Sequence, residues 1–119
     1  MGWAWGSSYG GMVGSDAVFA YPCSSCASGA AASAVQMAGY FPADFTAPTA
    51  SITQKKAALL ANGDLALTFE TPWTGGQALS FMYGRGTFIP GMQGLAQLGP
   101  HDYHPVLASV SSSGVMTSR

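Results

Sequence analysis

Three short segments of the sequence carry side chains that could bind a metal or take part in redox chemistry. Met12 lies in a glycine-rich turn, where the missing neighbouring side chains would let a flat ligand approach its thioether. Cys23 and Cys26 are separated by two residues, and so are His101 and His104. Thioether, thiolate and imidazole groups all bind transition metals. These residues therefore direct attention to ligand binding.

The Cys23–Cys26 pair allows several interpretations. Attachment of a c-type haem needs His directly after the second Cys, and Ala27 stands there. A thioredoxin-like redox site needs a helix start in a βαβ setting, which the sequence does not indicate. A zinc site would need two further ligands, for which His101 and His104 are the distant candidates. We favour the remaining interpretation, a small loop disulfide in an oxidising compartment or two free thiols.

The sequence has few residues that could act as general acids or bases. The chain has five carboxylates, and no two of them have a spacing that would pair them on one element. They are Asp16, Asp44, Asp64, Glu70 and Asp102. The densest polar cluster runs from His101 to His104 after a Gly-Pro turn, and it is either the wall of a pocket or an exposed loop. We do not expect this chain to be an enzyme by itself.

Ser8 lies in a Gly-x-Ser-x-Gly sequence, Gly6–Gly10, which is the pattern of the nucleophile turn in serine hydrolases. That turn must lead from a strand into a helix, but the residues that follow Gly10 are Gly-Met-Val-Gly. The match therefore lacks its structural context, and Ser8 is not predicted to be a nucleophile.

The composition indicates one domain with few charged residues. The chain has 119 residues, of which 8% are charged, and a formal net charge of -1. Without a basic patch, both nucleic-acid binding and electrostatic attachment to anionic membranes lack their main driving force. No run of about eighteen apolar residues predicts a transmembrane helix. The first residues do not resemble a signal peptide either.

The elements that must position these side chains are short strands. Trp3 and Trp5 are two residues apart and would face the same side of a strand. From Asp16 to Tyr21 the chain is mainly apolar and predicts a short strand that begins directly after the glycine-rich turn. Residues 52–60 and 65–70 predict a hairpin across the turn signal Asn62-Gly63.

The other segments follow the same strand-and-turn pattern, with the elements expected as follows. We predict an irregular connection over 40–50, a strand over 78–84, a candidate functional loop over 87–100 and a last strand over 106–110. Residues 27–39 leave both helix and strand open, since Ala30-Ala31-Ala32 favours a helix while Val35, Met37 and the flanking glycines would allow a strand. Residues 1–110 would form the domain, and the Ser-rich residues 111–119 a tail or linker. The fold class predicted from these elements is all-β, an immunoglobulin-like antiparallel β-sandwich of six or seven strands.

Two sequence blocks carry a resemblance to a known family. Gly2-Trp3-Ala4-Trp5-Gly6 followed by Gly11-Met12-Val13-Gly14-Ser15-Asp16-Ala17-Val18 resembles the middle of a DOMON domain, a family named after dopamine beta-monooxygenase. Residues 65–72, the strand at 79–84 and the turn Gly99-Pro100 continue the resemblance in the same order. It covers most of the chain, from Gly2 to about Val110, and it implies a loop then a strand over 27–39.

The resemblance implies a cofactor. Some DOMON domains, among them the cytochrome domain of cellobiose dehydrogenase and plant auxin-induced ascorbate-reducible proteins, bind haem b through one Met and one His. Met12 matches the Met of that pattern. Gln97 and Leu98 stand where family sequences tend to have His, so His101 or His104 would be the second iron ligand. Ligation by Met and His suits electron transfer.

The resemblance also implies partners and a location. DOMON domains usually have two or three strands before the Gly-Trp block, so the chain is expected to be truncated at its N-terminus. Family members are mostly extracellular or membrane-anchored ectodomains. A transmembrane b-type cytochrome or a flavin domain of the full-length protein would be the redox partner. The alternatives are a haem-free domain that binds a sugar or another ligand, and an accessory domain of a copper monooxygenase.

Overall fold

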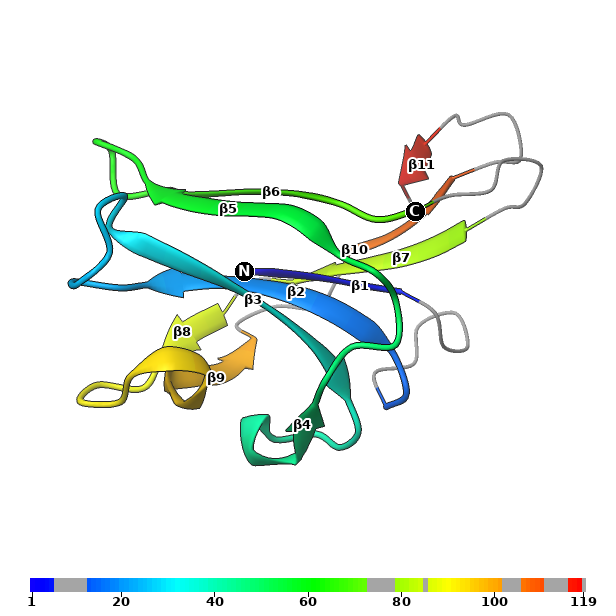
Figure 1. The fold of residues 1–119 in the computed structure, drawn as a ribbon, viewed down its shortest axis with the longest axis horizontal. Coiled ribbons are helices and arrows are strands. Elements are labelled where there is room, and N and C mark those ends of the chain that lie inside the picture. Colours follow the sequence, from blue (N-terminus) through cyan, green and yellow to red (C-terminus); the bar gives the residue numbers. More distant parts are fainter. Residues whose placement is uncertain (6–12, 73–78, 85, 102–105, 111–115, 119) are drawn as a thin grey trace.

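The computed structural model describes residues 1–5, 13–72, 79–84, 86–101, 106–110 and 116–118. Residues 79–84, 87, 100–101, 106–110 and 116–118 are described through their backbone alone. Within these residues the chain forms eleven strands and two short 3-10 turns, and no α-helix (Figure 1). All strand pairs are antiparallel, which confirms the predicted all-β class.

Seven of the strands form one sheet in the order β11-β10-β7-β1-β2-β3-β4. They are β1 (Gly2–Trp5), β2 (Asp16–Pro22), β3 (Ala30–Met37), β4 (Phe45–Thr46), β7 (Leu79–Gly84), β10 (Val106–Val110) and β11 (Met116–Ser118). The other four strands form two pairs, β5 (Thr53–Leu59) with β6 (Leu65–Glu70) and β8 (Gly86–Phe88) with β9 (Leu98–His101). The 3-10 turns are η1 (Pro42–Asp44) and η2 (Gly94–Gln97).

Strand β2 is mostly buried on both of its faces. Ala17 shares one face with Ala4, Val35 and Met37, and Leu95 of η2 packs against this core cluster. Val18 lies on the opposite face, because successive side chains of a strand alternate.

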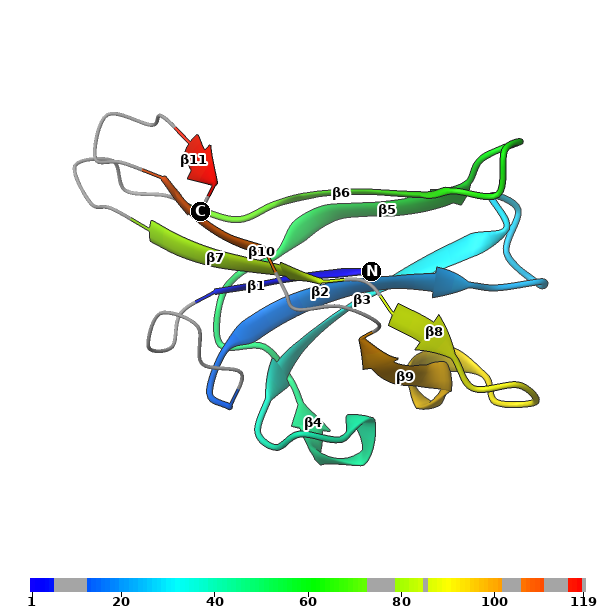
Figure 2. The ribbon, with the colours of Figure 1, turned by 180° about the vertical axis from the view of Figure 1, so that it is seen from behind.

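The β5–β6 hairpin covers the second face of the sheet. In Figures 1 and 2 this hairpin lies along one side of the seven-stranded sheet, and β8, β9 and η2 lie on the other side. The ring of Trp5 in β1 stacks on Phe69 of β6, with centroids 5.5 Å apart. Trp3 and Trp5 point to this same face, because their partners in β2 are Val18 and Asp16. The predicted hairpin and the shared face of the two tryptophans are therefore confirmed.

Several segments differ from the sequence-based expectation. The segment 87–100, expected to be a loop, contains most of β8 and β9 with η2 between them. Within the expected tail, Met116–Ser118 forms β11 and pairs with β10. The expected irregular connection 40–50 contains η1 and the two-residue β4. These strands have two to four residues, which is too short for periodicity to indicate them.

The architecture is thus one large sheet with a hairpin over one face and a smaller pair of strands near the other. The immunoglobulin-like sandwich, with two comparable sheets face to face, stays a prediction. Among the described residues, no helix has the length and apolar character needed to cross a membrane.

Candidate functional site

The described part of the glycine-rich motif runs from Val13 to Asp16 and is tied to the end of β3. The Gly14 amide donates to the carbonyl oxygen of Met37 at 2.8 Å, and the Met37 amide donates to the carbonyl oxygen of Ser15 at 2.8 Å. Gly14 has φ 91°, a conformation that side chains disfavour, so the turn requires glycine here. Two reciprocal hydrogen bonds therefore fix the backbone directly before β2.

Asp16 anchors the same end of β2 to a distant segment. Its buried carboxylate accepts hydrogen bonds from the Thr49 amide at 2.8 Å, the Thr49 hydroxyl at 2.6 Å and the Ala50 amide at 3.1 Å. Hydrogen bonds to an ionised acceptor are stronger than those between neutral groups. We call this arrangement the Asp16 clamp; it joins the motif to the segment that leads into β5.

The predicted haem ligands are not placed by the structure. Met12 and His104 lie outside the described residues, and His101 is described only as the last backbone position of β9, opposite Gly86. The structure therefore neither brings these three side chains together nor separates them.

Trp3 of β1 and Phe19 of β2 are two large aromatic side chains near the glycine-rich motif whose positions the structure describes. Trp3 and Phe19 lie on opposite faces of the sheet, because Trp3 pairs with Val18 and is one residue out of phase with Phe19. The Phe19 ring stacks on Phe45, with centroids 5.6 Å apart and an interplanar angle of 2°. The two rings therefore do not share one surface of the sheet.

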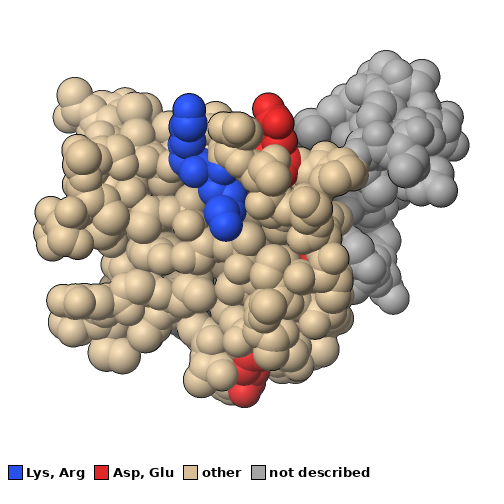
Figure 3. All heavy atoms as spheres, in the orientation of Figure 1, with Lys and Arg blue, Asp and Glu red and all other residues tan. Residues whose placement is uncertain are grey.

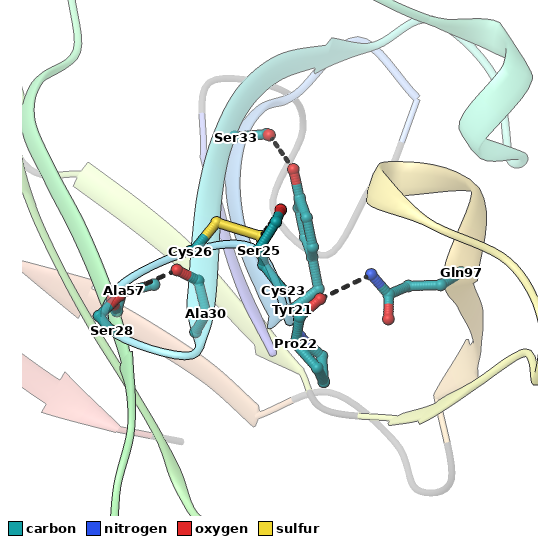
Figure 4. Close-up of a disulfide and its surroundings, with 10 residues drawn as sticks. All are labelled: Tyr21, Pro22, Cys23, Ser25, Cys26, Ser28, Ala30, Ser33, Ala57 and Gln97. Carbon is teal, nitrogen blue, oxygen red and sulfur yellow. Dashed lines mark hydrogen bonds between the residues drawn. A yellow bond between two sulfur atoms is a disulfide. The ribbon is translucent and has the colours of Figure 1, made fainter.

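At the other end of β2, Cys23 and Cys26 form a disulfide with Cα atoms 5.4 Å apart (Figure 4). The bond excludes the free-thiol alternative in this structure, and with it a zinc site that needs both thiolates. Among the residues that are described, no group of three or more His, Cys, Asp or Glu side chains could hold a metal ion. Both half-cystines are partly exposed.

Two polar side chains pack beside the disulfide loop. The Gln97 amide of η2 is buried and donates to the Pro22 carbonyl oxygen at 3.1 Å, which joins η2 to the end of β2. The Tyr21 and Ser33 hydroxyls share a hydrogen bond of 2.5 Å between β2 and β3. Every described buried side-chain nitrogen or oxygen has a hydrogen-bond partner. These groups therefore support the structure through hydrogen bonds between its elements.

The described surface is sparsely charged. In the view of Figure 3, the basic atoms, which belong to Lys55 and Lys56 on β5, form one area, and most of the described surface is uncharged. Tyr40 and Phe41, in the turn between β3 and η1, are each 71% exposed. Two adjacent exposed aromatic rings give this turn a flat apolar surface that could contact a ligand.

Comparison of the chain with protein-family models, with curated proteins and with solved structures finds no match. The DOMON resemblance therefore stays a prediction that rests on the sequence blocks.

Sequence reasoning missed the partners of the Asp16 clamp and the role of Gln97. A signal for the clamp was present, because Asp16 begins an otherwise apolar strand and buried carboxylates need partners. Nothing local pointed to Thr49, which lies 33 residues further along the chain. Gln97 had no comparable signal, since it lies in a Gly-rich segment without periodicity.

Proposed function

We propose that this chain is a non-catalytic module of the DOMON type that binds haem b and transfers electrons within a larger redox protein. Met12 would supply one axial ligand, and His101 or His104 the other. The observation that carries the proposal is the anchoring of Val13–Asp16 by the Met37 hydrogen bonds and the Asp16 clamp. A ligand that acts in electron transfer benefits from a rigid support, and this backbone has one directly after Met12.

The donor set fits the cofactor. A thioether and an imidazole together fill both axial positions of a haem iron, and the thioether raises its reduction potential. When bound, the haem would supply the one-electron chemistry. The chain would supply the two ligands and the fixed backbone next to Met12.

The disulfide supports the location that the resemblance implies. Disulfides form and persist in oxidising compartments, and the Cys23–Cys26 bond joins two partly exposed half-cystines. An extracellular or membrane-anchored ectodomain fits this chemistry. We therefore propose a transmembrane b-type cytochrome or a flavin domain of the full-length protein as the redox partner.

A second function, haem-free binding of a sugar or another uncharged ligand, is favoured by one specific observation. The exposed residues Tyr40 and Phe41 offer two aromatic side chains to a ligand. A glycan array with the wild-type chain and the Tyr40→Ala/Phe41→Ala variant tests it. Binding that the double variant loses supports this function, and an array without signal contradicts it.

Haem reconstitution tests the first function. We expect the wild-type chain to bind haem b stoichiometrically and to give the Soret and visible bands of a six-coordinate low-spin iron. Met12→Ala should give a five-coordinate spectrum and a lowered potential, and one of His101→Ala and His104→Ala should lose low-spin ligation. Met92→Ala is the matched control, because Met92 is an exposed methionine in another turn. A wild-type chain that binds no haem would overturn the proposal.

A further inference from the structure

The loop between β2 and β3 holds its shape through backbone hydrogen bonds as well as through its disulfide. The Cys23 amide donates to the Gly29 carbonyl oxygen at 2.9 Å, the Cys26 amide to that of Cys23 at 3.2 Å, and the Gly29 amide to that of Cys26 at 3.0 Å. The disulfide spans only three residues of sequence, so it closes a very short loop. A bond this local restricts the unfolded chain little, because its stabilisation grows with loop length.

The same loop is attached to the hairpin that covers the sheet. The Leu59 amide of β5 donates to the Ser28 carbonyl oxygen at 2.9 Å. The Ser28 hydroxyl has two acceptors, the Ala57 carbonyl oxygen of β5 at 2.7 Å and the Ala30 carbonyl oxygen of β3 at 3.0 Å (Figure 4). Gly29, at φ 77°, lies so close to Leu59 that an added Cβ atom would be 3.1 Å from the Leu59 Cβ. The conformation of the disulfide loop therefore determines how the end of β5 is held.

The two sulfur atoms differ in their surroundings. The Ser25 hydroxyl lies 3.5 Å from the Cys23 Sγ, and it must be the donor because a disulfide sulfur has no proton. A hydrogen-bond donor stabilises negative charge on this sulfur, which makes Cys23 the better leaving group in thiol–disulfide exchange. Partial exposure of both half-cystines gives an external thiolate access.

We propose that the Cys23–Cys26 disulfide is a thiol–disulfide exchange site for dithiols, and that its reduction releases the end of β5 from the β2–β3 loop. The first thiolate of the dithiol attacks the Cys26 Sγ, a mixed disulfide forms and the Cys23 thiolate leaves beside Ser25. The second sulfur of the dithiol, as a thiolate, then attacks the first sulfur of the same dithiol, which is bonded to the Cys26 Sγ. This closes the ring of the dithiol and displaces the Cys26 thiolate. The dithiol loses two electrons and becomes a cyclic disulfide, and its two protons end on Cys23 and Cys26.

This inference does not depend on haem, so it is tested on the protein without added haem. The first measurement is the rate of reduction by dithiothreitol without denaturant, followed by alkylation and mass spectrometry. We expect the native protein to gain two alkylated thiols, and Ser25→Ala to be reduced about threefold more slowly because its leaving thiolate lacks a donor. Ser24→Ala, an exposed neighbour, should react like the wild type. Equal rates for Ser25→Ala and the wild type would refute Cys23 as the leaving group.

The second measurement is amide hydrogen exchange in β5 and β6. We expect the reduced wild type and the Cys23→Ser/Cys26→Ser variant to exchange the amides near Leu59 about tenfold faster than the oxidised protein, because local opening becomes easier. Ser28→Ala keeps the disulfide and should show part of this increase. The oxidised and reduced wild type give this comparison even if the double variant does not fold. A disulfide that is reduced only after unfolding, or unchanged exchange near Leu59, overturns the proposal.

Discussion

The two ends of β2 are fastened by different physical means. At the Asp16 end a buried carboxylate accepts three hydrogen bonds from Thr49 and Ala50, which are distant in sequence. At the other end a partly exposed covalent bond joins Cys23 to Cys26 across two residues. The comparison teaches that a covalent bond need not contribute more to the free energy of unfolding than a set of hydrogen bonds. The contribution of a disulfide depends on the length of the loop that it closes, whereas that of a buried carboxylate depends on whether all its hydrogen-bond partners are present.

The largest effect is expected from Asp16→Ala. The substitution leaves the Thr49 and Ala50 amides and the Thr49 hydroxyl without their acceptor, and we expect the free energy of unfolding to fall by about 3 kcal/mol. Urea denaturation followed by circular dichroism measures it. Asp44→Ala is the control, because Asp44 is exposed, and it should change stability by less than about 0.5 kcal/mol. Similar losses in the two variants would show that the clamp contributes nothing specific.

A smaller effect is expected at the disulfide end. Cys23→Ser/Cys26→Ser should lower the free energy of unfolding by about 2 kcal/mol, near the low end for disulfides, because the closed loop is short. The same urea titration measures it, with Ser24→Ala as the control. If this variant lost more stability than Asp16→Ala, the ranking of the two ends would be reversed.

The smallest effect concerns the Met1 amino group, which donates to the Ala20 carbonyl oxygen at 3.1 Å near the disulfide end of β2. Burial lowers the pKa of this amino group below its ordinary value of 8.0. Between the lowered folded-state pKa and 8.0 the unfolded chain binds more protons, so stability should rise slightly with pH and level off above 8.0. Urea midpoints at several pH values check this.

The control for this pH dependence is the same chain with an acetylated N-terminus. Acetylation removes the titrating group but keeps an N–H that can donate to Ala20, so the contribution of the amino group should vanish. An identical pH profile for both chains would exclude Met1 as its cause.

Sequence reasoning succeeded where the structure is local. The strand from Asp16 and the hairpin around Asn62-Gly63 follow from apolar runs and a turn signal, which neighbouring residues decide. The sequence analysis did not predict β8, β9 and β11. Each has only three or four residues and forms a strand because it pairs with another short segment of the folded chain.

The candidate site divides in the same way. The disulfide lay among the interpretations that the spacing of Cys23 and Cys26 allowed, since both residues belong to one short loop. The Asp16 clamp could not be completed from the sequence, because only the folded chain brings Thr49 to Asp16. The haem ligands were named from the family resemblance and stay a prediction.

The central place of β1 has a consequence for how fast the chain folds. Gly2 pairs on one side with Phe19 of the adjacent β2 and on the other with Gly84 of β7, a partner far along the chain. The β1–β2–β3 meander can form early, because its strands are close in sequence. The pairing of β1 with β7 can form only when the long segment between these two strands has closed into a loop. Such non-local pairing slows the search for the native state, so refolding from urea should take milliseconds to seconds.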